Sequence, residues 1–114
     1  MHEMGIAIEL IDSLKGICKE NGVEHLHSVT LTLGEASMVV PRFMADCWNA
    51  AVADTDYKDT KLKIVQTVAK GRCNHCGAEF EIAKCKQKCP RCGAFNDFIP
   101  ISGMEVEISE IEAD

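Results

Sequence analysis

Two similar cysteine turns organise this chain: Cys73-Asn74-His75-Cys76-Gly77 and, further along, Cys89-Pro90-Arg91-Cys92-Gly93. Two C-x-x-C pairs at this separation can close four thiolates around one tetrahedral ion. Glycine suits the position after each pair, because such a turn folds back on itself and the next residue often takes a positive φ. The spacing therefore predicts a closed structural metal site whose ligands are Cys73, Cys76, Cys89 and Cys92.

The type of ligand leaves two metals open for this site. Zinc and iron both accept four thiolates in a tetrahedron, and a rubredoxin-like iron cage uses the same two turns. Disulfides are disfavoured, since a C-x-x-C disulfide closes a short, strained loop and stabilises little. We expect zinc, and a colourless rather than a red protein would distinguish it from iron.

Composition limits the class of protein. The 114 residues suffice for one ordinary domain with a small module, and the net charge is −6. An acidic chain argues against a broad nucleic-acid surface and against binding to anionic membranes. No apolar run approaches the roughly 20 residues that span a bilayer, and the first residues do not resemble a signal peptide. We therefore expect a cytoplasmic protein, in which reduced thiols agree with metal binding.

Hydrophobic periodicity predicts an α+β fold. Residues 4–20 and 41–52 repeat apolar side chains at steps of three and four, which indicates two amphipathic helices. Residues 25–34 and 104–109 alternate apolar and polar side chains, and residues 61–69 are rich in aliphatic ones, which indicates three strands. We expect the two helices to pack on this three-stranded sheet, with the four-cysteine segment inserted as a zinc-ribbon-like module.

These elements divide the chain into two parts. Residues 1–69 with 99–114 form the α/β part. Residues 70–98 form the zinc-binding part, whose small size makes its folding depend on metal. This insert is rich in Lys and Arg, whereas residues 105–114 carry five acidic and no basic side chains. The positive charge either balances four thiolates on a dication or forms a docking patch, and both interpretations stay open.

The first three residues, Met1-His2-Glu3, form a second candidate metal site. The α-amine of Met1, the main-chain nitrogen of His2 and the His2 imidazole can hold one ion in fused chelate rings, and Glu3 adds an oxygen. Nitrogen and oxygen donors with imidazole suit Ni²⁺ or Cu²⁺. The same triplet also fits a plain helix start, at which His2 is solvated and Glu3 complements the helix dipole.

Several motifs occur in a distinctive order along the whole chain. After Met1-His2-Glu3 and the first helix come Leu33-Gly34-Glu35, Val40-Pro41, the two cysteine turns and the closing segment 103–108. Together they resemble the HypA/HybF family of nickel metallochaperones for [NiFe]-hydrogenase maturation. The N-terminal triplet combined with the cysteine turns is the specific part, since many zinc ribbons share the turns alone.

This resemblance implies what the protein does and with which groups. Nickel binds at the N-terminus through His2, with the Met1 amine and Glu3 in support, and zinc binds the four cysteines. The family implies delivery of Ni²⁺ to the hydrogenase large subunit with the GTPase HypB, by a protein that is not an enzyme. We expect a monomer or weak homodimer that binds neither nucleic acid nor membrane.

Two side chains of the insert depart from the family pattern. Some members have a histidine beside a zinc-site cysteine that moves between ligand sets, whereas His75 lies inside the first turn, so we expect no exchange role for it. Cys85 is an additional cysteine, and we expect a free thiol because the paired turns already complete a tetrahedron. From the residues alone, two other functions stay open: a zinc ribbon that binds nucleic acid or protein, and a rubredoxin-like electron carrier.

Overall fold

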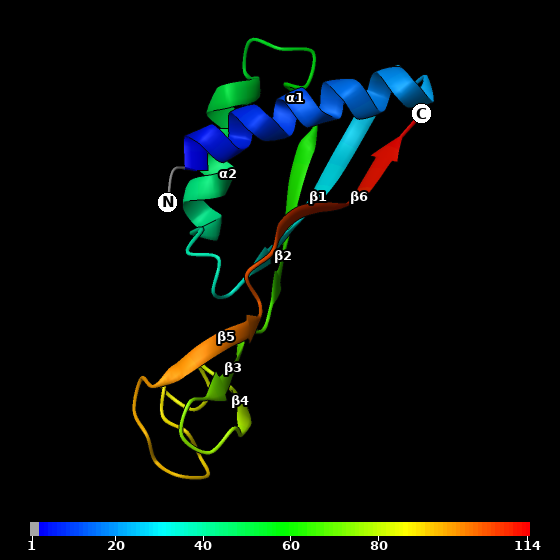
Figure 1. Ribbon diagram of the computed structural model, residues 1–114. Coiled ribbons are helices and arrows are strands. Elements are labelled where there is room, and N and C mark those ends of the chain that lie inside the picture. The colour runs from blue at the N-terminus through cyan, green and yellow to red at the C-terminus, as the bar shows by residue number, and fades with distance from the viewer. Residues whose placement is uncertain (1–2) are drawn as a thin grey trace. The chain divides into compact units, whose positions relative to one another are not determined.

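The computed structural model describes residues 3–114, so Met1 and His2 lie outside the described residues. Figure 1 shows the elements, which in chain order are α1 (Glu3–Asn21), β1 (Leu26–Gly34), α2 (Pro41–Val52), β2 (Lys61–Thr67), β3 (Lys70–Cys73), β4 (Glu79–Glu81), β5 (Phe98–Ser102) and β6 (Val106–Ala113). They form two three-stranded sheets, with the strand orders β2-β1-β6 and β4-β3-β5. The predicted α+β fold is therefore confirmed. Neither helix in residues 3–114 combines the length and apolarity needed to cross a bilayer.

The chain folds as two compact units. The first contains the described residues up to Thr32 together with Val39–Val65 and Glu107–Asp114. The second contains Leu33–Met38 and Gln66–Val106, and it includes the whole β4-β3-β5 sheet.

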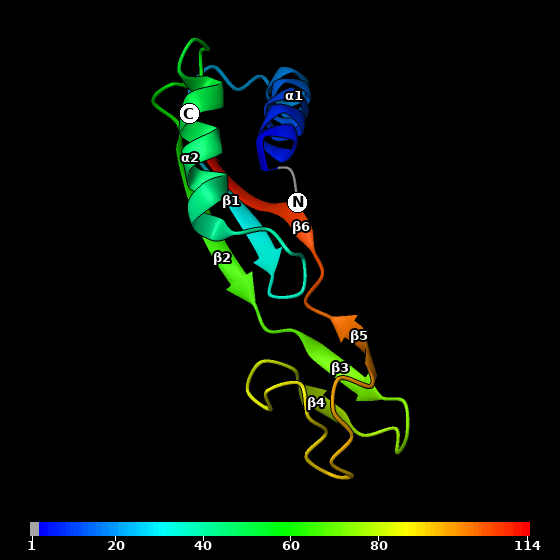
Figure 2. The ribbon, with the colours of Figure 1, turned by 90° about the vertical axis from the view of Figure 1, so that its left-hand side faces the viewer.

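The core of the first unit lies between the two helices and the β2-β1-β6 sheet. Figures 1 and 2 show both helices on the same face of this sheet. The central strand β1 supplies Val29 and Leu31, which are 0% and 1% exposed. Trp48 of α2 is also buried, and its indole Nε1 donates a hydrogen bond to the Thr60 carbonyl at 3.1 Å. The buried residues of α1 recur at the predicted helical spacing and are Ala7, Leu10, Ile11, Leu14 and Cys18.

In the second unit, two glycines let separate backbone segments touch. Gly34 ends β1, and a Cβ atom there would lie 1.9 Å from the carbonyl oxygen of Gly103. Gly103 has a φ of +85°, and a Cβ atom there would lie 2.4 Å from the Cα of Ala69. Hydrogen bonds run from Gly34 N–H to Glu105 O at 2.8 Å and from Ala36 N–H to Gly103 O at 2.7 Å. Glycine is therefore required here by close packing of main chain against main chain.

The small sheet centres on β3, which pairs antiparallel with both β4 and β5. Gly71 of β3 lies opposite Phe80 on one side and Pro100 on the other. A Cβ atom at Gly71 would come within 2.8 Å of the Phe98 ring. The rings of Phe80 and Phe98 meet edge to face with their centroids 5.5 Å apart. Phe80 is buried together with Cys73 and Cys89, and Phe98 packs against this core.

Candidate metal centre

The four cysteines of the two C-x-x-C turns meet at one place in the second unit. The Sγ atoms of Cys73, Cys76, Cys89 and Cys92 all lie within 4.8 Å of one another. The Sγ atoms of Cys73 and Cys92 are 3.5 Å apart, and so are those of Cys76 and Cys89. These distances fit a tetrahedron of thiolates, whose edge is about 3.8 Å for a metal–sulfur bond of about 2.3 Å. Within residues 3–114, no other cluster of three or more metal-ligating side chains forms.

The two halves of the site share one backbone arrangement. In each turn the glycine N–H donates to the carbonyl of the first cysteine, and that cysteine's N–H donates to the carbonyl of the alanine after the glycine. The four donor–acceptor pairs are Gly77–Cys73 at 3.0 Å, Cys73–Ala78 at 2.8 Å, Gly93–Cys89 at 2.9 Å and Cys89–Ala94 at 2.9 Å. Gly77 and Gly93 have φ values of +74° and +81°, as the sequence predicted, since side chains are strained in this region.

Main-chain amides prepare the first cysteine of each turn to ionise. The Cys76 amide, which donates to the sulfur, lowers the pKa of Cys73, and the Cys92 amide lowers the pKa of Cys89 to about 6. At Cys92 the Ala94 amide lowers the pKa, but the neighbouring thiols outweigh it and raise the pKa to about 12. Four thiolates this close repel one another, so full ionisation requires a cation among them.

The four cysteines differ in burial: Cys73 and Cys89 are buried, Cys76 is half-buried and Cys92 is exposed. Cys73 and Cys89 are 3% and 2% exposed, and together with Phe80 they form the buried core of the small sheet. Four protein ligands complete a tetrahedron and leave no position for a substrate, which is typical of a structural rather than a catalytic ion. Thiolate sets of this geometry suit zinc or iron.

The two additional side chains of the insert lie outside the group of four sulfurs. The imidazole Nε2 of His75 pairs with the carboxylate of Asp97, and the Asn74 amide nitrogen donates to the same carboxylate at 2.9 Å. Asp97 therefore holds the first cysteine turn against the segment that leads into β5. Cys85 is half-buried and packs on the core that contains Cys73 and Cys89.

Of the predicted nickel-binding residues, Met1 and His2 lie outside the described residues, and Glu3 lies within them. Glu3 is the first residue of α1 and is half-buried. Its Oε2 accepts a hydrogen bond from the main-chain N–H of Val40 at 3.0 Å. The carboxylate of Glu3, a predicted nickel-binding residue, therefore lies at the start of α2.

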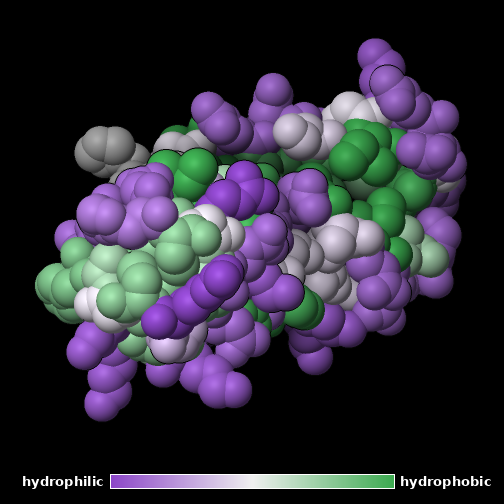
Figure 3. Space-filling view, turned by 60° about the horizontal axis from the view of Figure 1, so that its bottom comes forward, coloured by the Kyte–Doolittle hydropathy of each residue, from purple (hydrophilic) through white to green (hydrophobic). Residues whose placement is uncertain are grey.

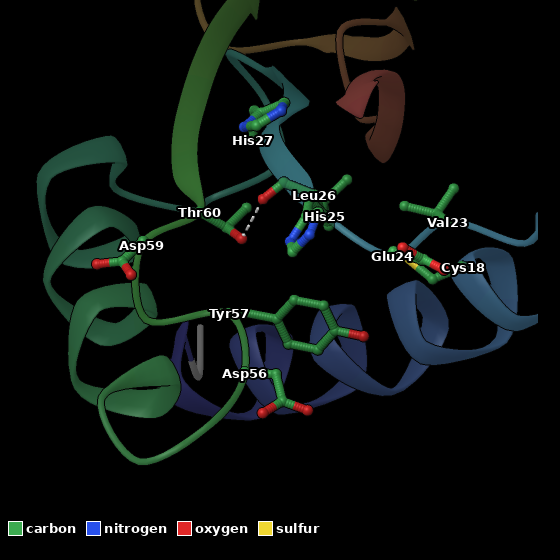
Figure 4. A pocket seen from close by; sticks show the side chains of 10 residues that line it. All are labelled: Cys18, Val23, Glu24, His25, Leu26, His27, Asp56, Tyr57, Asp59 and Thr60. Carbon is green, nitrogen blue, oxygen red and sulfur yellow. Dashed lines mark hydrogen bonds between the residues drawn. The ribbon is translucent and has the colours of Figure 1, made fainter. Parts of the chain in front are cut away.

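A pocket of about 440 Å³ in the first unit contains two of the other histidines. Figure 4 shows His25 and Tyr57 facing each other across this pocket. Burial is the main cause that raises the pKa of Tyr57. The second histidine, His27, pairs through Nε2 with Asp114 at 3.0 Å. Neither histidine belongs to a cluster of three or more metal-ligating side chains among residues 3–114.

The surface of the second unit combines apolar and basic side chains. Phe95 is 68% exposed and Ile99 is 50% exposed. Figure 3 brings the end with β3, β4 and β5 forward and shows pale green apolar surface bordered by purple hydrophilic residues. The Lys and Arg residues of the insert are Lys70, Arg72, Lys84, Lys86, Lys88 and Arg91.

Comparisons with known proteins extend over the whole chain. A family model described as hydrogenase/urease nickel incorporation, metallochaperone, hypA matches residues 1–113. The hydrogenase maturation factor HypA of Geotalea uraniireducens is 35% identical over 115 residues, which cover 100% of both chains. The factor of the same name from Geobacter metallireducens is 33% identical with the same coverage.

The fold agrees with these matches. The solution structure of the Ni metallochaperone HypA from Helicobacter pylori superimposes with a TM-score of 0.70 at 23% identity, covering 99% of this chain and 97% of that chain. The family match includes Met1-His2-Glu3 and all four clustered cysteines. The chain therefore belongs to the HypA family of nickel-incorporation metallochaperones for hydrogenase maturation.

Proposed function

We propose that this protein binds Ni²⁺ at its N-terminus and delivers it to the large subunit of [NiFe]-hydrogenase during maturation. The ligands are the imidazole of His2 and the α-amine of Met1, with Glu3 in a supporting role. The observation that carries the proposal is the family match, which begins at residue 1 and so includes this triplet. Amine and imidazole nitrogens are donors that Ni²⁺ favours. The protein acts as a carrier and not as an enzyme.

The two metal sites have opposite tasks in this proposal. Nickel held by few protein ligands leaves positions for the ligands of an acceptor, so it can pass on by ligand exchange. The four-cysteine site has no such position and keeps its ion, which we propose is zinc. We propose that residues 1–69 with 99–114 form the nickel-binding part of the chain and that residues 70–98 form the zinc-binding part.

The proposed partners are the GTPase HypB and the hydrogenase large subunit. We propose that the protein binds them in the cytoplasm as a monomer or a weak homodimer. None of the seven cysteines, all of which lie within residues 3–114, forms a disulfide, and cysteines that bind a metal as thiolates suit a reducing compartment. We propose that the basic insert, with the acidic segment 105–114, orients docking to these partners.

Nickel titration by calorimetry tests the carrier role. We expect the untagged protein to bind Ni²⁺ at micromolar concentration, and we expect binding at least about tenfold weaker in His2→Ala and in a chain extended before Met1, because each loses a nitrogen donor. Metal analysis of the same samples should show one zinc per chain that nickel does not displace. Equal nickel affinity in the three proteins would overturn the proposed site.

Charge reversal tests the docking role. Changing Lys84, Lys86 and Lys88 to Glu should weaken binding to HypB or the large subunit and flatten its salt dependence. The matched control reverses three exposed lysines of the first unit, Lys15, Lys19 and Lys58. Unchanged affinity and salt dependence in the first variant, or equal losses in both, would refute a specific role of the insert.

A further inference from the structure

The start of α2 lacks a capping side chain of its own. The N-cap residue is Val40, whose φ and ψ are −87° and 115°, and its side chain makes no capping hydrogen bond. Helix starts usually satisfy their free N–H groups with Ser, Thr, Asp or Asn at this position. In a capping box, an acid or amide at the third helical position accepts the N–H of the N-cap residue, but Phe43 occupies that position here.

Glu3 performs this function from another helix. Its Oε2 accepts the Val40 N–H at 3.0 Å although the two residues are 37 positions apart in sequence. Glu3 is the acidic residue in the first turn of α1, and the first turn of α2 contains none. Because each helix start carries a partial positive charge, this one carboxylate is favourably placed for both. The hydrogen bond therefore joins the first residue of α1 to the start of α2.

We propose that Glu3 is a positioning residue for nickel and not one of its ligands. Its carboxylate stays on the Val40 N–H, holds the first turn of α1 against α2, and thereby presents the nickel-binding residues that precede it. This inference rests on the proposed N-terminal nickel site. Without the anchor the first turn of α1 frays, and the apparent nickel affinity falls in proportion to the fraction of molecules that remain competent to bind.

Two substitutions separate positioning from ligation. Glu3→Gln keeps an oxygen that can accept the Val40 N–H but replaces the carboxylate with a poor metal ligand, so we expect nickel affinity within about threefold of wild type and an unchanged absorption spectrum. Glu3→Ala removes the anchor, and we expect about tenfold weaker binding with the same spectrum. Glu9→Gln, on the exposed side of α1, controls for the loss of one negative charge.

Hydrogen exchange at the Val40 amide gives a readout that is independent of nickel affinity. We expect this amide to be protected in wild type and Glu3→Gln, exposed in Glu3→Ala, and equally protected before and after nickel is added. Deprotection by nickel, or a Glu3→Gln variant with the weak binding of Glu3→Ala and an altered spectrum, would show that the carboxylate moves onto the ion and would overturn the inference. Equal nickel affinity in wild type and His2→Ala would instead overturn the proposed function itself.

Discussion

Replacing Gly34 with alanine tests the close backbone contact in the second unit. The new Cβ atom would lie 1.9 Å from the Gly103 oxygen and 2.6 Å from Met104 N, whereas real Cβ contacts under 3.0 Å are essentially absent. Both neighbours are main chain and cannot rotate away, so the segments must separate by about 1 Å. That movement disrupts the hydrogen bonds from Gly34 N–H to Glu105 O and from Ala36 N–H to Gly103 O.

The expected loss of stability follows from these two effects. Each hydrogen bond contributes about 0.5–1.5 kcal/mol, and overpacking against a fixed neighbour costs about 1–3 kcal/mol. Gly34→Ala should therefore destabilise the protein by about 2–6 kcal/mol, a large part of the roughly 5–15 kcal/mol of a typical domain. Gly16→Ala is the matched control, because a Cβ atom there meets nothing within 4 Å. In the middle of α1 it should stabilise by about 0.5–1 kcal/mol.

Urea unfolding of the metal-loaded protein, followed by far-ultraviolet circular dichroism, measures both changes. The unfolding midpoint should fall in Gly34→Ala and rise in Gly16→Ala, with similar slopes. A Gly34→Ala midpoint equal to or above that of wild type would contradict this prediction, since it would mean that these backbones separate at no cost.

Two further predictions concern the metal and pH. Removing the ion with a chelator should raise amide exchange across β3, β4 and β5, while emission from Trp48, the sole tryptophan, stays unchanged because it is buried in the first unit. Loss of Trp48 burial in the same step would contradict this. The pKa of Glu112 is lowered mainly by a hydrogen bond from Lys63 and next by one from Ser28. The stabilisation from these two hydrogen bonds is present at neutral pH and is lost as the pH falls below 4.5, the ordinary glutamate pKa. Urea midpoints should therefore drop less on acidification in Glu112→Gln than in wild type. Equal drops would refute the contribution.

The large elements were predictable from sequence, whereas the small sheet was not. Both helices were predicted within one or two residues, because their apolar stripes recur over 12 to 19 residues. Strand β6 was expected at 104–109 and runs from Val106 to Ala113. Strands β3, β4 and β5 have three to five residues each, which is too short for a periodic signal. They form because the cysteine turns bring their ends together.

The candidate site shows the same division. The cysteine pairs and their glycines were recognisable because each turn is a local structure of five residues, and the structure brings all four sulfurs together. The pairing of His75 with Asp97 was missed. The bond from Val40 to Glu3 was missed too, and the absence of a capping residue before Pro41 was the one signal that could have indicated it.

Local sequence was enough to indicate the metal-binding turns, the two amphipathic helices and the strands of the larger sheet, since each depends on residues a few positions apart. The folded chain was needed to establish the strand order in each sheet, the glycine contact between Gly34 and Gly103, and the use of the Glu3 carboxylate at the start of α2. The physical reason is distance along the chain: periodicity and turn chemistry are local, whereas these contacts join segments that become neighbours only when the apolar faces pack together.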